Sequence, residues 1–251
     1  YKANREYRYL FPLVLFFFFC SVFGASMNII RQILACVVFY IALSYSDNKL
    51  RMCGLILLSI LIHYSSAIFI VAVFLGSNVF KILDNNKVVI IVYLVCFIIG
   101  STLYSLFLNY LPLDIMSEKY VNSVNSEETF ALTSGLGVIA VNGVNILLMI
   151  TSKKVRSFFS NKKVDLLYRC FFVGCFLSTF MGYSIFLSRV PLGLTNIRIF
   201  LLAFTVYYLS QRRTSFCLIV KICIILLYIL FFIMGILHSD NGCSPYIFKW
   251  L

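Results

Sequence analysis

The sequence predicts an all-α fold, a polytopic bundle of transmembrane helices. Of its 251 residues, 62% are hydrophobic and only 12% are charged, and the mean hydropathy is +0.98. A water-soluble domain of this length has no core large enough to bury so much apolar surface. Apolar runs of about 20 residues recur along the chain, which is the length of a helix that crosses a bilayer. The runs are continuous rather than alternating, and this excludes an outer-membrane barrel.

We expect about eight or nine membrane segments within one integral membrane domain, residues 1–251. Some of the runs are short, as happens when a helix is buried among its neighbours. No internal repeat and no low-complexity linker divides the chain. The apolar runs lie at residues 9–28, 30–46, 52–75, 88–108, 131–151, 165–187, 197–210 and 215–237.

The charges of the connecting loops set the expected orientation. Cytoplasmic loops of membrane proteins carry an excess of lysine and arginine. We therefore place the basic stretch "KKVRSFFSNKK" (residues 153–163) in the cytoplasm and the acidic loop 109–130 outside. The net charge of +12 then reflects membrane topology and does not indicate a nucleic-acid partner.

The run 52–75 is expected to break near His63. With "DNKLR" (residues 47–51) inside and the acidic loop outside, the chain must cross the membrane an odd number of times between them. The apolar runs supply an even number. Two short segments that meet at the polar stretch "LIHYSSAIF" restore the parity, place "KILDNNK" inside, and set His63 near the outer side beside a cavity. Irregular backbone at membrane depth is tolerated where protein or a water-filled cavity covers it.

Arg31 is the first candidate site residue, because the same count places it on the outer side, where arginine is disfavoured. Asn28, Arg31 and Gln32 follow the i, i+3, i+4 spacing of one helical face. A guanidinium suits phosphate or diphosphate, which it binds through parallel hydrogen bonds. The alternative is a side chain that extends from a helix end to the membrane interface.

The same count places further basic side chains on the outer side. His63 stands in an apolar run with Ser65, and ionisable residues within the membrane are functional candidates. Arg189 precedes a proline–glycine turn, and Arg198 opens an apolar span in "SRVPLGLTNIR". The alternatives are a hydrogen-bonded packing role for His63 and interface anchoring for the two arginines.

The stretch "SGLGVIAVNGVN" (residues 134–145) combines small residues with two amides. Asn142 and Asn145 share a helical face, and the glycines favour close helix packing over a phosphate loop. Neither a nucleotide-binding pattern nor zinc-ligand spacing occurs, so no cofactor and no metal are expected.

Four segments together resemble the EpsG/Wzy-like polysaccharide polymerases. "NIIRQILA" and "HYSSAIF" are similar to that family's Arg-Gln-x-x-Ala helix and His-x-Ser segment, and they are followed by "NIRIFLLAF" and "SPYIF". The resemblance covers nearly the whole chain. Because family members have further spans ahead of the Arg-Gln motif, it implies that this sequence is a C-terminal portion of such a protein.

The resemblance implies a multi-pass enzyme of the bacterial inner membrane with its active site facing the periplasm. Such enzymes join repeat units of O-antigen, capsule or exopolysaccharide, and transfer the growing chain from undecaprenyl diphosphate to a new lipid-linked unit. The implied partners are that lipid-linked oligosaccharide, membrane lipid, and a chain-length regulator or flippase.

We assign the site residues from this chemistry. A departing diphosphate needs positive charge, and a histidine can act as a base or orient a hydroxyl. The expected catalytic residues are Arg31, His63 and Arg198. The expected substrate-binding residues are Asn28, Gln32, Ser65, Arg189 and Asn142.

Two other functions remain open at this stage. A transporter or flippase for lipid-linked saccharides would also use intramembrane arginines and broken helices. Its expected signature, repeat symmetry with a charge path through the midplane, is not found in the sequence. The second alternative is a membrane acyltransferase or another lipid-linked glycosyltransferase.

Overall fold

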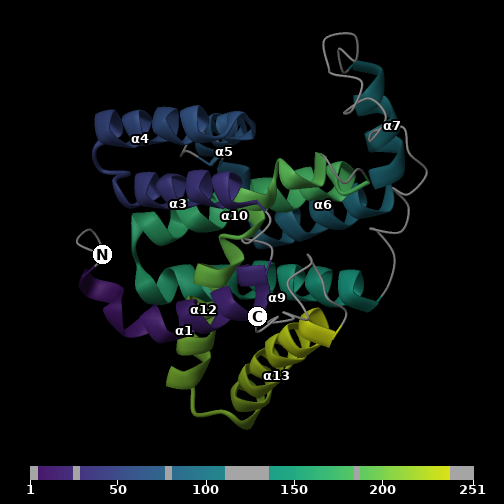
Figure 1. Cartoon of the computed structure of the whole chain (residues 1–251). Helices are drawn as coiled ribbons and strands as arrows, with labels where there is room; N and C mark the ends of the chain where they lie inside the picture. The colour runs from purple at the N-terminus through teal and green to yellow at the C-terminus, as the bar shows by residue number, and fades with distance from the viewer. Residues whose placement is uncertain (1–4, 25–28, 77–80, 111–135, 184–186, 238–251) are drawn as a thin grey trace, which may run out of the picture. The chain divides into compact units, whose positions relative to one another are not determined.

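The computed structural model describes residues 5–24, 29–76, 81–110, 136–183 and 187–237, and every regular element in these ranges is helical (Figure 1). This confirms the all-α prediction. The 3-10 turns are η1 (Arg5–Leu10), η2 (Tyr64–Ala67), η3 (Lys81–Asp84) and η6 (Leu187–Arg189). The α-helices are α1 (Phe11–Ser21), α3 (Ile30–Ser44), α4 (Lys49–Ile62), α5 (Ile68–Leu75), α6 (Asn86–Ile98), α7 (Gly100–Tyr110), α9 (Leu136–Phe159), α10 (Lys162–Met181), α11 (Leu192–Thr195), α12 (Arg198–Gln211) and α13 (Ser215–Leu237).

The helices have the length and composition of a membrane bundle. In the described ranges, four helical segments are long and apolar enough to cross a bilayer, and a bent pair can form a fifth span. The four segments are Gly137–Phe159, Lys162–Met181, Leu192–Gln211 and Ser215–Leu237. Shorter apolar helices cover Tyr7–Ser21, Ile30–Ser44 and Tyr64–Leu75. The predicted helical membrane bundle is thus confirmed. Of the eight or nine expected segments, four or five have full spanning length within the described ranges.

The chain divides into two compact units. Unit 1 comprises Tyr1–His63 with Ile199–Leu251, and unit 2 comprises Tyr64–Arg198. We describe each unit by its own contacts.

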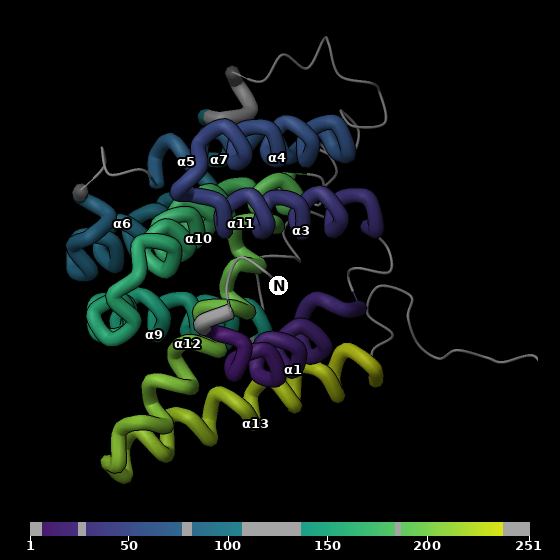
Figure 2. Tube along the Cα trace, turned by 90° about the vertical axis from the view of Figure 1, so that its left-hand side faces the viewer, coloured from purple at the N-terminus to yellow at the C-terminus, as the bar shows by residue number. Residues whose placement is uncertain are grey.

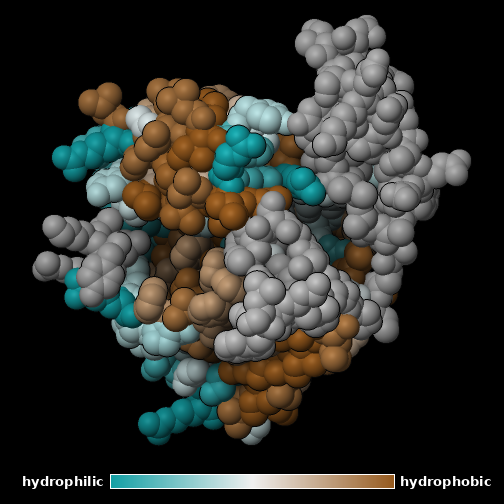
Figure 3. All heavy atoms as spheres, viewed as in Figure 1, coloured by the Kyte–Doolittle hydropathy of each residue, from teal (hydrophilic) through white to brown (hydrophobic). Residues whose placement is uncertain are grey.

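Unit 1 contains two helix pairs, α3 with α4 and α1 with α13 (Figure 2). The α3–α4 hairpin is fastened by a buried hydrogen bond of 2.9 Å from Ser59 Oγ to the Ala35 carbonyl oxygen. In the other pair, the rings of Phe17 and Tyr228 meet edge to face at 5.0 Å. Large apolar side chains of α4 and α13 are exposed and form hydrophobic surface in Figure 3. Such apolar outer faces suit contact with lipid.

The helix breaks at His63, as the sequence predicts. α4 ends at Ile62, and His63 itself is extended, with φ −151° and ψ 117°. The chain resumes as η2 and then α5. Ser65 and Ser66 stand in η2, and the buried Ser66 hydroxyl has no hydrogen-bond partner among the described residues.

Unit 2 is organised around α10, which packs against α5, α6, α7, α9 and α11. Its closest neighbour is α11, because Gly174 has no side chain. A Cβ atom at Gly174 would lie 2.5 Å from Leu194 Cβ and 2.9 Å from the Leu194 carbonyl carbon. This contact draws the segment before Arg198 into the interior of unit 2, where Leu194 and Ile197 are completely buried.

An ion-pair cluster marks one end of unit 2. Asp84 of η3 pairs with Arg156 at 2.6 Å and with Arg169 at 2.8 Å, while Arg156 also pairs with Asp165 at 2.6 Å. Burial alone would raise the pKa of Asp84, but the two arginines outweigh it and hold the pKa below its usual value. "KILDNNK" therefore lies at the same end of unit 2 as the basic stretch 153–163, in agreement with the prediction that both share one side.

The apolar run 88–108 was expected to be one span, but the structure divides it. α6 and α7 meet at Ile99 with a bend of 71°. Gly100 lies against α10 at this bend, where a Cβ atom would come within 2.5 Å of the Thr179 carbonyl oxygen. The predicted external loop 109–130 lies almost wholly outside the described residues.

The glycines of residues 134–145 do not pack as expected. A Cβ atom added to Gly137 or Gly143 would meet no atom within 4 Å, so neither glycine mediates a close helix contact in the described part of the chain. Gly135 lies outside that part.

Gly174→Ala is expected to destabilise the protein, because the added methyl group would overlap Leu194. Overpacking of this kind costs about 1–3 kcal/mol. Gly143→Ala is the matched control and should be neutral or stabilising by up to about 1 kcal/mol, since alanine favours a helix and the site is open. Thermal unfolding of both variants in detergent checks the prediction, and equal melting temperatures would contradict it.

Lys87→Cys tests the predicted orientation in a background without native cysteines. Lys87 lies near the ion-pair end of unit 2, which is predicted to face the cytoplasm. An impermeant maleimide should therefore label the cysteine only in permeabilised cells. Gly137→Cys, at the first turn of α9, should react in intact cells. Labelling of Lys87→Cys from outside would show that the orientation is reversed or the topology is different.

Candidate functional site

A chain of hydrogen-bonded side chains in unit 2 links Arg198, the last residue of that unit, to α9 and α6. Arg198 Nη1 donates to Asn145 Oδ1 at 3.3 Å, and Asn145 Nδ2 donates to Tyr93 Oη at 3.3 Å. Tyr93 Oη in turn donates to Asn142 Oδ1. Asn145 and Tyr93 are almost completely buried. Two predicted site residues, Arg198 and Asn142, are thus joined through Asn145, which the sequence places on the same helical face as Asn142, and through Tyr93, which the sequence did not single out.

The direction of each bond in this chain follows from Arg198. A guanidinium donates hydrogen bonds and cannot accept them, so the atom of Asn145 that faces it must be the oxygen. The Asn145 amide nitrogen then faces Tyr93, and the Tyr93 hydroxyl proton is left for Asn142. Asn142 must accept with its oxygen. Its Nδ2 group therefore has no partner among the described residues.

Arg198 follows a buried segment of unit 2, in which Leu194, Asn196 and Ile197 are buried, and is itself part-buried. This burial does not test the predicted position of residues 188–198 on the outer side, which stays a prediction. Leu194 contacts Gly174, which is about 10 Å along α10 from its C-terminal end. No carboxylate in the described ranges pairs with Arg198, and its hydrogen-bond partner there is the neutral side-chain amide of Asn145.

A cavity of about 350 Å³ opens beside Asn142. It lies at the end of unit 2 opposite the ion-pair cluster, where α9 begins and α10 ends. The lining residues are Phe97, Gly137, Val138, Val141, Asn142, Ser178, Thr179, Gly182 and Tyr183. Apolar walls with a few polar groups are typical of a binding site for a small molecule or a substituent.

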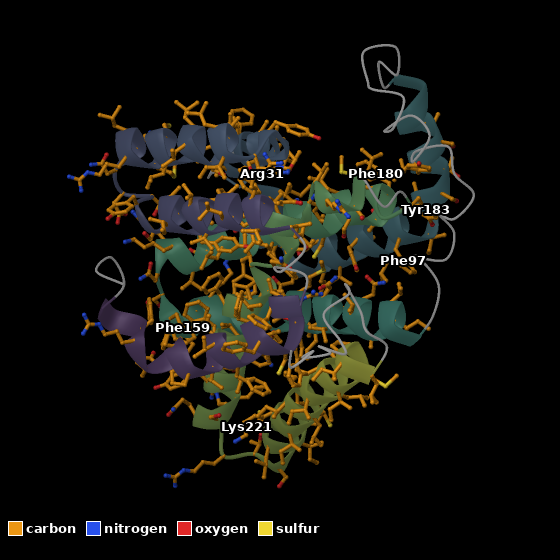
Figure 4. The ribbon with its side chains drawn as sticks, in the orientation of Figure 1. Arg31, Phe97, Phe159, Phe180, Tyr183 and Lys221 are labelled. Carbon is orange, nitrogen blue, oxygen red and sulfur yellow. The ribbon has the colours of Figure 1, made fainter. Side chains whose placement is uncertain are left out.

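Two aromatic rings bound this cavity, Phe97 from α6 and Tyr183 just after α10 (Figure 4). Tyr183 stacks on Tyr104, with ring centroids 5.8 Å apart and planes 25° apart. Its ring also lies over Gly100, where a Cβ atom would approach within 3.1 Å. The bend between α6 and α7 thus positions one wall of the cavity.

Unit 1 brings together two of the expected catalytic residues. Arg31 is exposed on the first turn of α3, and His63 is half-buried after α4. In the described ranges, no acidic side chain pairs with Arg31. Burial, and secondly the charge of Arg31, lower the pKa of His63 below its ordinary value. The imidazole is therefore neutral at physiological pH and able to accept a proton.

The remaining predicted residues occupy different places. Gln32 is buried in α3, with 4% of its surface exposed. Ser65 is half-buried in η2, and Arg189 is exposed in η6. Asn28 lies outside the described residues. None of these positions tests a role in substrate binding, so the roles stay predictions.

Tyr93 and the ion-pair cluster were not predicted from the sequence. Tyr93 stands in an apolar run without any local motif, and only its contact with the asparagines of α9 reveals it. Arg169 did carry a signal, since it interrupts the apolar stretch "LLYRCFFVG". A charge within a span needs a partner, and Asp84 is that partner.

Arg31→Gln is expected to raise the pKa of His63, because it removes a neighbouring positive charge. Protonation of His63 is disfavoured in the folded protein relative to the unfolded chain. The free energy of unfolding therefore decreases as the pH falls from the ordinary pKa of histidine through the lowered pKa. NMR of histidine-labelled protein can follow the titration, and His238→Asn leaves His63 as the single histidine. An unchanged pKa in Arg31→Gln would contradict the coupling.

Comparison of the sequence with models of known protein families identifies a match. The model of the EpsG family matches residues 1–248. Searches of curated proteins and of solved structures find no match. The match agrees with the resemblance noted in the sequence, and it supports a polymerase-like role in polysaccharide biosynthesis at a membrane. Matched over nearly its whole length, the chain belongs to the EpsG family.

Proposed function

We propose that this protein polymerises lipid-linked oligosaccharide repeat units into a surface polysaccharide on the outer side of the bacterial inner membrane. The observation that carries the proposal is Arg198, a part-buried cation at the start of an apolar helix without a carboxylate partner in the described ranges. A charge in that position needs a counterion, and an anionic substrate supplies one.

The reaction is a glycosyl transfer. The oxygen of an acceptor hydroxyl forms a bond to the anomeric carbon of the chain carried on undecaprenyl diphosphate. The bond between that carbon and the diphosphate oxygen breaks, and the lipid diphosphate leaves with the electron pair. The acceptor hydroxyl loses its proton to a base.

Arg198 is proposed to stabilise the leaving diphosphate. Its Nη1 group is used by Asn145, and the other guanidinium N–H groups remain for phosphate oxygens. Cationic donors fixed where negative charge develops lower the barrier most effectively in a site of low dielectric constant. Arg31, exposed on α3 and unpaired by any described acid, is the second candidate for this role.

His63 is proposed as the base. The lowered pKa keeps its imidazole neutral, and an extended backbone between two helices leaves the side chain half-exposed. Gln32, Ser65, Arg189 and Asn142 are proposed to bind the lipid-linked oligosaccharide. A chain-length regulator or flippase is the proposed protein partner.

Complementation of a deletion strain tests the function. The wild-type gene should restore the ladder of long surface chains, and Arg198→Ala should leave single repeat units only, because chain transfer fails while units still reach the surface. Arg31→Ala and His63→Ala should shorten or abolish the ladder. Removal of a transition-state donor slows catalysis by about 10²–10³-fold.

Arg212→Ala is the matched control, since Arg212 follows α12 and is exposed beside the Tyr208 ring. It should restore the full ladder. Loss of every surface repeat unit in the deletion strain would instead indicate a flippase. A full ladder with Arg198→Ala would remove that residue from the site.

A further inference from the structure

We infer that the cavity beside Asn142 binds one sugar ring of the oligosaccharide, and that Asn142 Nδ2 donates a hydrogen bond to an oxygen atom of that ring. The inference rests on the proposed function and assigns part of its substrate site. The inference is based on the polar chain from Arg198, because that chain uses the oxygen of Asn142 and leaves its Nδ2 group as the hydrogen-bonding group available to a ligand.

The orientation of the Asn142 side chain fixes its Nδ2 group as a donor to a ligand. Each member of the chain is oriented by the one before it, beginning with a guanidinium that can only donate. Rotating the Asn142 amide by 180° would set its NH₂ group against the Tyr93 hydroxyl, whose proton already points toward it. The amide nitrogen therefore serves whatever occupies the cavity.

Two residues that line the cavity, Ser178 and Thr179, carry hydroxyl oxygens that can accept hydrogen bonds. Ser178 Oγ donates to the Cys175 carbonyl oxygen at 2.8 Å, and Thr179 Oγ1 donates to the Phe176 carbonyl oxygen at 2.7 Å. Both protons are thus used, and the oxygen lone pairs remain. The wall offers one committed donor and two acceptors to a ligand.

This combination fits a neutral polyol. A sugar hydroxyl both donates and accepts, so neighbouring hydroxyls can satisfy Asn142 and the two alcohol oxygens together. An isoprenoid tail would leave all three groups without partners, which is unfavourable away from water. A phosphate would meet the lone pairs of Ser178 and Thr179 rather than donors.

The rest of the wall suits the faces of a sugar ring. Phe97 and Tyr183 present aromatic surface, against which the C–H groups of a pyranose can pack. Tyr183 is held by its stacking on Tyr104. A volume of about 350 Å³ accommodates a single ring with solvent or a substituent, but not a whole repeat unit.

Asn142→Asp tests the donor. Aspartate keeps the shape and the oxygen that accepts from Tyr93, but it replaces the NH₂ donor by a second acceptor. The probe is the undecaprenyl-diphosphate-linked repeat unit that accumulates in the deletion strain, and its binding to purified protein in nanodiscs is measured by native mass spectrometry. We expect about ten- to hundredfold weaker binding. Asn161→Asp is the matched control, because Asn161 caps α10 through an oxygen that aspartate retains.

A second pair of variants fills the cavity without relying on Asn142. Val138→Trp would occupy the space, whereas Ile139→Trp adds the same bulk to the neighbouring position, which is 67% exposed and does not line the cavity. Val138→Trp should abolish binding and Ile139→Trp should retain it, with both proteins extracted as monodisperse species. This pair remains informative if Asn142→Asp is poorly folded.

The outcomes separate this inference from the proposed function. Wild-type binding by both Asn142→Asp and Val138→Trp would overturn the sugar site, while the ladder test of Arg198 would still stand. Weak binding by these variants together with normal binding by their controls supports it. If the wild-type gene restores no long chains, the proposed function fails first.

Discussion

The constraint on which the described site depends is the position of Arg198 within unit 2. Its guanidinium has a single amide partner in the described part of the chain, and it fixes the donor direction of Asn145, Tyr93 and Asn142. Arg198 is part-buried, a cation without a counterion is costly where water is restricted, and its remaining N–H groups are available for an anion. Both the diphosphate role of Arg198 and the donor role of Asn142 follow from this one placement.

At the opposite end of unit 2, two other arginines form ion pairs. Arg156 and Arg169 are both paired with carboxylates, and Asp84 connects them across η3, α9 and α10. Neutralised in this way, they stabilise the position of the helices and are poor candidates for anion binding. Arg198 differs because its partner is neutral, and this contrast separates a structural arginine from a candidate catalytic one.

Periodicity and loop charge were sufficient to predict the helical membrane bundle and the break at His63, because both follow from local composition. They also selected Arg198 and Asn142, which are unusual residues in apolar surroundings. They could not predict the bend at Gly100 or the buried segment before Arg198, because these depend on contacts of Gly100 and Gly174 with distant parts of the chain. Tyr93 was missed for the same reason, since its hydroxyl gains a role only beside α9.

The most direct test is a reaction with purified protein in liposomes that contain the lipid-linked repeat unit as their only saccharide. The measurement is undecaprenyl diphosphate released for each new glycosidic bond, together with the length of the product. We expect equal amounts of released lipid diphosphate and new glycosidic bonds with the wild-type protein, and neither product with Arg198→Ala. Movement of the repeat unit across the bilayer without any lengthening or release of lipid diphosphate would contradict it.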